Sequence, residues 1–106
     1  MEIISIDELH EAVENMGDNN LILDVRSAEE YSAGHIKGSQ NTPHEEVSGI
    51  SSDLSGYNKV YVHCKMGGRS KKAYKILQDN GFGTLKNLRG GIRAWSEEVD
   101  PDLPTY

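Results

Sequence analysis

Short hydrophobic runs alternate with amphipathic stretches along this chain, and each kind of stretch predicts its own type of element. Runs rich in β-branched and apolar residues predict strands at "EIISI" (2–6), "LILDV" (21–25), "KVYVH" (59–63) and "TLKNL" (84–88). Stretches with helical spacing separate these runs. The alternation predicts an α/β domain with a central, mostly parallel sheet of four or five strands flanked by helices.

Capping signals locate the expected helices. The patterns Ser5-x-x-Glu8 and Ser27-x-x-Glu30 are capping boxes, which predict the starts of two helices. Ser70 is predicted to cap a third helix, after a loop over residues 64–69. The remaining segments are expected to form a short helix and a loop over 44–56, a last helix over 92–99 and a loose tail over 99–106.

Length and composition fit one domain over residues 1–106. No apolar run approaches the roughly 20 residues that cross a bilayer, and the first residues lack the basic start and apolar stretch of a signal peptide. We therefore expect a cytoplasmic protein that does not enter membranes. The net charge of −6 argues against a general nucleic-acid binder.

Positive charge gathers around the only cysteine, Cys64. Residues 57–78 contain no Asp or Glu but six Lys or Arg residues. One interpretation is a solvated, lysine-rich helix face. The other is a local field that favours a thiolate and an anionic substrate. A single cysteine excludes an intramolecular disulfide, and the four histidines have no ligand-like spacing, so no metal site is expected.

The order strand, "CKMGGR", helix gives Cys64 a chemical context. Ligands bind beyond the carboxyl ends of parallel strands, and a helix N-terminus presents unpaired N–H groups. A tight loop can turn its own N–H groups inward as an anion-binding nest, for which Gly67 and Gly68 are expected to supply backbone conformations that a side chain would obstruct. The alternative is an inert, buried cysteine.

Two reactions use a thiolate in such a nest: attack on phosphorus or arsenic in an oxyanion, and sulfur transfer through a persulfide. Cysteine-dependent phosphatases place five residues between Cys and Arg, whereas four lie between Cys64 and Arg69. The smaller nest suits one additional sulfur atom and favours sulfur transfer.

Three motifs in order resemble the single-domain rhodanese family: "LILDVRSAEEYSAGHIKGSQNTP", "CKMGGR" and "LRGGIRAW", which together span about 21–95. Ser39 and Thr42 depart from the usual family residues, outside the loop. The resemblance implies a three-layer rhodanese-like fold and a thiosulfate sulfurtransferase without metal or cofactor. It also implies a small-molecule sulfur donor and a thiol acceptor, which could belong to a protein. An arsenate reductase or phosphatase-type enzyme and a non-catalytic binding module remain the alternatives.

The resemblance also implies roles for individual residues. Cys64 is the nucleophile, and the substrate-binding loop consists of Lys65, Met66, Gly67, Gly68 and Arg69. Lys65 and Arg69 are expected to attract a dianionic donor. Asp24 and Arg26 have a supporting role, either lining the pocket or forming a structural pair. Neighbouring strand residues point to opposite faces, so a dyad of Cys64 with His63 is not expected. Packing roles are expected for His35, Ile92 and Trp95.

Overall fold

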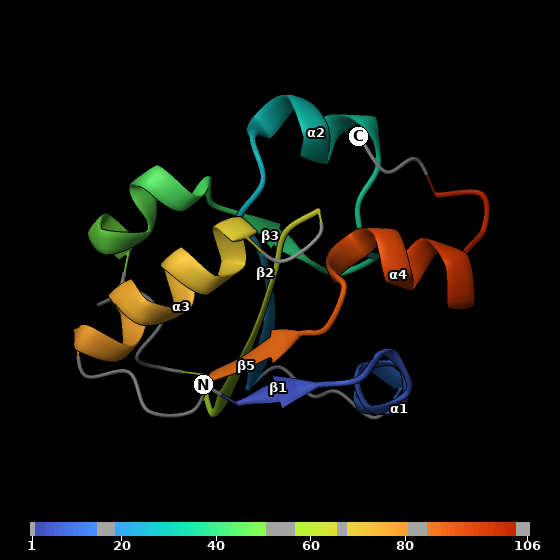
Figure 1. Ribbon diagram of the computed structural model, residues 1–106, viewed down its shortest axis with the longest axis horizontal. Coiled ribbons are helices and arrows are strands. Elements are labelled where there is room, and N and C mark those ends of the chain that lie inside the picture. The colour runs from blue at the N-terminus through green and yellow to red at the C-terminus, as the bar shows by residue number, and fades with distance from the viewer. Residues whose placement is uncertain (1, 15–18, 51–56, 66–67, 81–84, 104–106) are drawn as a thin grey trace.

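The computed structural model contains a five-stranded, all-parallel sheet with helices on both faces (Figure 1). It describes residues 2–14, 19–50, 57–65, 68–80 and 85–103. The strand order is β1-β5-β4-β2-β3. In chain order the elements are β1 (Ile3–Ile4), α1 (Ile6–Glu14), β2 (Asn20–Asp24), α2 (Ala28–Ala33), β3 (Gln40–Asn41), the 3₁₀ helix η1 (His44–Ile50), β4 (Lys59–His63), α3 (Gly68–Asp79), β5 (Leu85–Leu88) and α4 (Gly91–Glu98).

The predicted α/β architecture is confirmed, and its central strands are the two clearest runs in the sequence. β2 and β4 pair in register from Asn20 opposite Lys59 to Asp24 opposite His63. Four of the five residues in each strand are buried, as expected for strands covered on both faces. The remaining strand, the two-residue β3, lies outside the four runs that the sequence pattern assigns to strands.

Two hydrophobic clusters fill the layers on either side of the sheet. α3 and η1 cover one face, where Val60, Val62 and Cys64 belong to the buried cluster. α1 and α4 cover the other face, where Tyr61 and Trp95 belong to the second cluster. The alternation along β4 therefore sends successive side chains into different layers.

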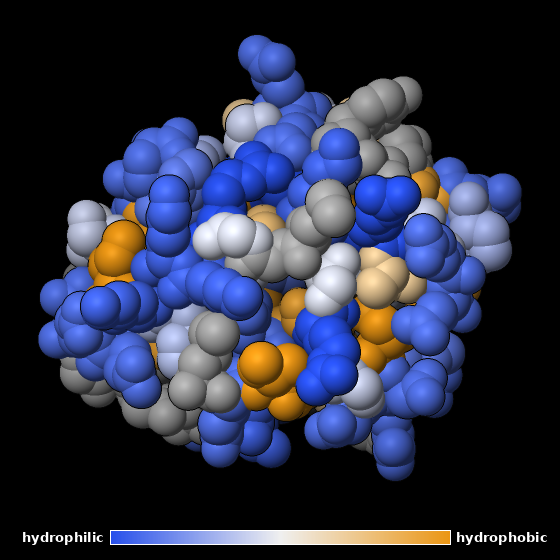
Figure 2. Space-filling model, viewed as in Figure 1, coloured by the Kyte–Doolittle hydropathy of each residue, from blue (hydrophilic) through white to orange (hydrophobic). Residues whose placement is uncertain are grey.

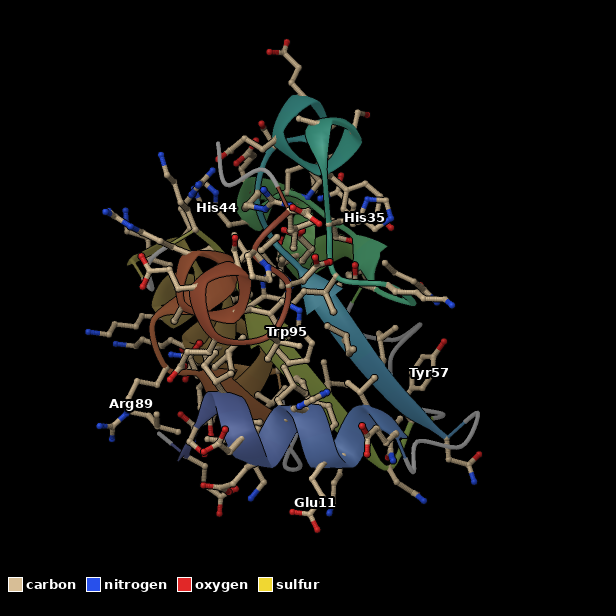
Figure 3. All side chains as sticks on the ribbon, turned by 90° about the vertical axis from the view of Figure 1, so that its right-hand side faces the viewer. Glu11, His35, His44, Tyr57, Arg89 and Trp95 are labelled. Carbon is tan, nitrogen blue, oxygen red and sulfur yellow. The ribbon has the colours of Figure 1, made fainter. Side chains whose placement is uncertain are left out.

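The last helix is anchored as the sequence predicts. Trp95 and Ile92 are buried, and Trp95 lies between α4 and α1, whereas Glu11 and Arg89 point outwards (Figure 3). The described part of the predicted loose tail makes contacts with the rest of the fold. Leu103 packs against the second cluster, and its backbone carbonyl accepts a hydrogen bond from the Ser96 hydroxyl at 2.9 Å. Residues 104–106 lie outside the described ranges.

α3 begins earlier than predicted. The sequence assigns Gly68 and Arg69 to a loop and makes Ser70 the cap, but helix α3 already starts at Gly68. Ser70 is fully buried within the first turn. Tertiary packing here outweighs the local preference of serine for a capping position and the poor helix propensity of glycine. Glycine commonly ends helices, so the sequence predicts that the first helix ends at Gly17 and the third at Asn80-Gly81. Gly17 and Gly81 fall outside the described residues.

The visible surface is mostly hydrophilic. In the view of Figure 2 the hydrophobic patches are small and separated by charged and polar side chains. Among the described residues, Ile3 is the large hydrophobic residue that is exposed, at 47%. None of the helices in the described ranges combines the length and hydrophobicity needed to span a bilayer.

Candidate active site

Cys64 directly follows β4, the central strand of the sheet, and only 1% of it is exposed. Its side chain belongs to the cluster on the α3 side. Helix α3 begins four residues later, at Gly68, so the thiol lies between the carboxyl end of a strand and a helix N-terminus. Met66 and Gly67, which the sequence places in the same loop, lie outside the described residues.

The N-terminus of α4 holds the start of this loop. The N–H of Ile92 donates to the Cys64 carbonyl at 2.8 Å, and the N–H of Arg93 donates to the Lys65 carbonyl at 3.2 Å. In a trans peptide the carbonyl and the next N–H point in opposite directions. Because the Cys64 carbonyl points towards α4, the Lys65 N–H points away from it, towards the side on which α3 and the Cys64 side chain lie.

Gly91 makes this close approach possible. A Cβ atom at Gly91 would lie 2.4 Å from the Cys64 carbonyl oxygen and 2.6 Å from that of Lys65, and its φ is +62°. Two successive glycines such as Gly90 and Gly91 are a turn signal in the sequence, but that signal does not predict this contact with the loop. The expected steric reason for Gly68 is wrong: it has no positive φ, and a Cβ there would meet nothing within 4 Å. Gly68 instead has the helical backbone of the first turn of α3.

Arg69 forms a bidentate ion pair with Glu30 of α2. Its Nη1 and Nη2 atoms lie 2.5 Å and 2.9 Å from the two carboxylate oxygens, and the side chains are 31% and 19% exposed. Hydrogen bonds from Arg69 are the main cause that lowers the pKa of Glu30 to about 2, against the opposing effect of burial. From the sequence we expect Arg69 to attract an anionic donor. In the structure its guanidinium is already paired with the carboxylate of Glu30.

Glu30 is the functional candidate that sequence reasoning missed, although a local signal for its position existed. It is the fourth and last residue of the predicted capping box, which the structure contains: the Ser27 N–H donates to Glu30 Oε1 at 3.1 Å, and the Glu30 N–H donates to Ser27 Oγ at 3.2 Å. The box therefore fixes a carboxylate at the end of the sheet that carries Cys64.

Asp24 and Arg26 form a fully buried pair, one of the two possibilities left open by the sequence. The Arg26 Nη2 atom donates to Asp24 Oδ2 at 2.7 Å and to the Gly34 carbonyl at 2.7 Å. Its Nη1 atom has no hydrogen-bond partner among the described residues. The pair therefore joins the end of β2 to the end of α2.

His63 lies in the layer opposite Cys64, as strand alternation predicts. Its Nε2 atom is 3.9 Å from Asp24 Oδ2, and its Nδ1 atom is 3.4 Å from the Cys64 carbonyl oxygen. Complete burial lowers the pKa of His63, and the opposing charge of Asp24 does not reverse the shift, so the fold favours the neutral form of the ring. His35 has the expected packing role: its ring stacks on Tyr31 at 3.7 Å, and Nδ1 lies 2.9 Å from the Tyr31 carbonyl.

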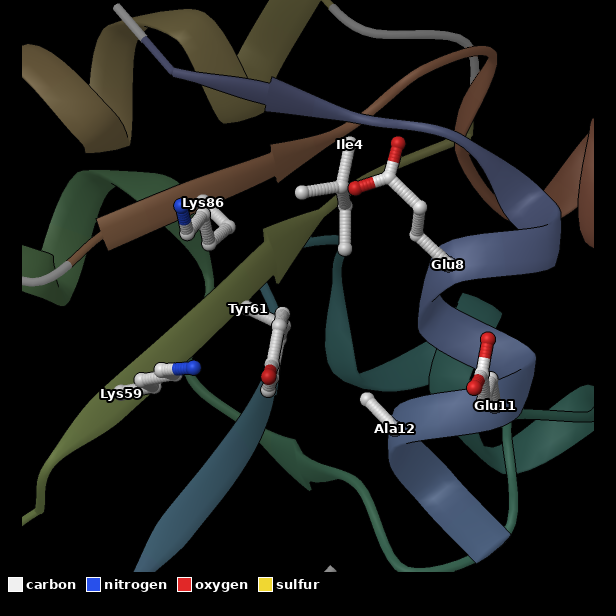
Figure 4. Close-up of a pocket in the computed structure, with 7 residues that line it drawn as sticks. All are labelled: Ile4, Glu8, Glu11, Ala12, Lys59, Tyr61 and Lys86. Carbon is white, nitrogen blue, oxygen red and sulfur yellow. The ribbon is translucent and has the colours of Figure 1, made fainter. Parts of the chain in front are cut away.

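A separate hollow of about 430 Å³ lies between the sheet and α1 (Figure 4). Its lining includes Lys59 at the start of β4 and Tyr61, which belongs to the cluster opposite that of Cys64. The hollow therefore lies on the sheet face opposite to the thiol. Lys59 begins β4 and Cys64 follows its end, so the length of a five-residue strand, about 16 Å, also separates that end of the hollow from the thiol. No group of three or more potential metal ligands occurs within the described ranges.

Comparison with known proteins places this geometry in a family. The chain is 34% identical to rhodanese-like/PpiC domain-containing protein 12 of Arabidopsis thaliana, over 97% of this chain and 36% of the relative. It is 33% identical to the adenylyltransferase and sulfurtransferase MOCS3-2 of Zea mays, over 85% of this chain and 20% of the relative. The chain thus spans about a fifth to a third of the length of these curated relatives.

Solved structures share the fold over all or most of the chain. A rhodanese-related protein from Thermoplasma volcanium is 29% identical, with a TM-score of 0.83 and coverage of 100% of both chains. The human single-domain sulfurtransferase TSTD1 is 25% identical, with a TM-score of 0.78, over 92% of this chain and 97% of its own. Residues 7–98 match the family described as Rhodanese-like domain, and the chain belongs to that family.

Proposed function

We propose that this chain is a sulfurtransferase that moves a sulfane sulfur from thiosulfate or a related donor to a thiol or cyanide acceptor through a persulfide on Cys64. The observation that carries the proposal is the position of Cys64 between β4 and the N-terminus of α3, with its carbonyl bound by α4. Membership in the family and the sulfurtransferase names of two relatives support the same reaction class.

The reaction is a double displacement with covalent catalysis. The Cys64 thiolate attacks the outer sulfur of thiosulfate, a new S–S bond forms, the old S–S bond breaks, and its electron pair leaves with sulfite. The thiolate of the acceptor then attacks the outer sulfur of the Cys64 persulfide and carries it away, which regenerates the Cys64 thiolate. In the cyanide assay the product of this second step is thiocyanate. Neither step needs a metal or an organic cofactor.

The surrounding residues have different parts in this proposal. Backbone N–H groups of the loop Lys65, Met66, Gly67, Gly68 and Arg69 would stabilise the negative charge on the persulfide, since Gly68 and Arg69 stand in the first turn of α3, where N–H groups lack intrahelical partners. Asp24 and Arg26 would support the site by fixing the ends of β2 and α2 without touching the sulfur.

Intact mass spectrometry of the purified chain tests the proposal. Thiosulfate should add about 32 Da, the mass of one sulfur atom, and cyanide should remove the adduct with release of thiocyanate. A Cys64→Ser variant should fold like the wild type and show no adduct. If neither thiosulfate nor an organic persulfide produces an adduct on the wild type, sulfur transfer is refuted, and oxyanion chemistry or a non-catalytic binding module becomes the better account.

A further inference from the structure

Arg69 and Cys64 lie close enough in the fold to interact electrostatically. The pKa of Arg69 is raised, chiefly by hydrogen bonds with Glu30 and to a smaller extent by its electrostatic interaction with Cys64, against the opposing effect of burial. Arg69 belongs to the first turn of α3, five residues after Cys64, so a donor that reaches the sulfur approaches this guanidinium. Its net charge is therefore a determinant of which donors bind.

Glu30 cancels that charge by a contact that is built into the fold. Both of its oxygens face the guanidinium, and one of them also accepts the Ser27 N–H of the capping box. The neighbouring Glu29 has the same side chain but is exposed, and no hydrogen bond or ion pair joins it to the loop in the described structure. One carboxylate of α2 is thus committed to Arg69, and the adjacent one is not.

We propose that Glu30 is a positioning residue that neutralises Arg69 and so makes the site favour sulfur donors with one negative charge or none, such as organic persulfides and thiosulfonates, over the dianion thiosulfate. This inference rests on the sulfurtransferase function proposed above and names its substrate class. A bidentate arginine–carboxylate pair leaves little uncompensated charge for a second anion. A dianion must bind beside the neutral pair or displace Glu30, which an uncharged or singly charged donor need not do.

The chemistry is the same for each donor, so a difference in rate reports on charge. With an organic persulfide, the Cys64 thiolate attacks the outer sulfur, one S–S bond forms and another breaks, and the electron pair leaves on the organic thiolate. With methanethiosulfonate, a monoanion, the leaving group is methanesulfinate. With thiosulfate it is sulfite. Methanethiosulfonate differs from thiosulfate by a methyl group in place of one charged oxygen, which makes the two donors a pair matched in shape.

The test is the ratio of kcat/KM for thiosulfate to kcat/KM for methanethiosulfonate, with cyanide as acceptor. Glu30→Gln should raise this ratio about three- to tenfold, because it uncovers the positive charge of Arg69: one unit charge taken at about 6 Å from the extra charge of the donor has this effect at effective dielectric constants of about 80 to 40. The change should appear in KM more than in kcat and shrink at 0.5 M salt. Glutamine retains the capping-box pattern, and a ratio of two donors on one protein is independent of the folded fraction.

Three further variants decide whether Glu30 acts through Arg69. Glu29→Gln makes the same charge change one residue away and should leave the ratio at the wild-type value. Glu30→Asp keeps the charge and should restore the ratio. In an Arg69→Ala background, Glu30→Gln should no longer change it, because the two residues act as a unit. An unchanged ratio in Glu30→Gln, or an equal change in Glu29→Gln, overturns the inference.

The two proposals fail in different ways. If no donor gives an adduct or turnover with the wild-type chain, the sulfurtransferase function itself fails. If the wild type turns over both donors and Glu30→Gln does so with the wild-type ratio, sulfur transfer stands and only the role of Glu30 is refuted.

Discussion

Replacing Gly91 with alanine puts a methyl group where α4 meets the loop that carries Cys64. The new Cβ would lie 2.4 Å and 2.6 Å from the carbonyl oxygens of Cys64 and Lys65. Carbon–oxygen contacts normally lie at about 3.3 Å or more. Both oxygens belong to the backbone, so no side-chain rotation can relieve the overlap. Either the loop or the start of α4 must move, and the hydrogen bond from Ile92 to Cys64 weakens.

The expected loss in free energy of unfolding for Gly91→Ala is about 3 kcal/mol. A left-handed backbone at a residue with a Cβ costs about 1 kcal/mol, and forcing atoms into a filled site costs about 1–3 kcal/mol. Gly38→Ala provides the matched control, since Gly38 also has a positive φ, +86°, but an added Cβ meets nothing within 4 Å. Gly38→Ala should lose only the roughly 1 kcal/mol that a left-handed backbone costs a residue with a Cβ. The difference in free energy of unfolding between the two variants therefore gives the cost of the overlap with the loop.

Urea unfolding of both variants, together with the rate of persulfide formation on Cys64, provides the assay. A shift of about 1 Å at a reacting group can cost about 10²-fold in rate, so Gly91→Ala should form the persulfide far more slowly than wild type, whereas Gly38→Ala should react normally. The reasoning is refuted if Gly91→Ala is as stable as Gly38→Ala and reacts at the wild-type rate.

Three further outcomes are expected. Asp24→Asn should lower the free energy of unfolding, measured in urea, by about 3–5 kcal/mol, because it leaves the buried Arg26 charge unpaired. Glu97→Gln removes an exposed ion pair with Arg93 and should cost less than about 1 kcal/mol. Equal losses in the two variants would contradict the role of the buried pair. Burial lowers the pKa of His63, so the imidazole takes up a proton when the chain unfolds near or below about pH 6.5. The free energy of unfolding should therefore decrease as pH falls through about 6.5, with a slope of up to about 1.4 kcal/mol per pH unit. His63→Gln should remove this slope in urea titrations. The pKa of Glu30 falls from 4.5 to about 2 in the fold, so its contribution is present above pH 4.5 and is lost between there and about 2; an acid transition unchanged in Glu30→Gln would contradict this.

Local patterns were sufficient for the parts of the fold that depend on neighbouring residues. The β-branched run "KVYVH" predicts β4, and Ser27-x-x-Glu30 predicts both the start of α2 and its capping box. The position of Cys64 at the end of a strand and close to the start of a helix follows from the same reading. These features are encoded within a few residues, which is the range over which hydrophobic periodicity and capping act.

The contacts that shape the site join distant segments and leave no local pattern. Arg69 and Glu30 are 39 residues apart, and neither the capping box nor the loop motif says that they meet. The role of Gly91 depends in the same way on the approach of α4 to the Cys64 carbonyl. The start of α3 was misplaced because serine is a common cap and glycine a poor helix former, whereas here Ser70 is buried and the helix begins at Gly68.

The hydrogen bonds from α4 to the loop also give the chain an order of assembly. Cys64 is synthesised before Gly91–Glu98, and its carbonyl receives the Ile92 N–H only when this helix has folded against the sheet. β1 likewise waits for β5, its parallel partner from the other end of the sequence. A nascent chain that has not yet reached Gly91 therefore carries the thiol without the geometry around it. The reactivity that we propose should begin only when the last helix is in place.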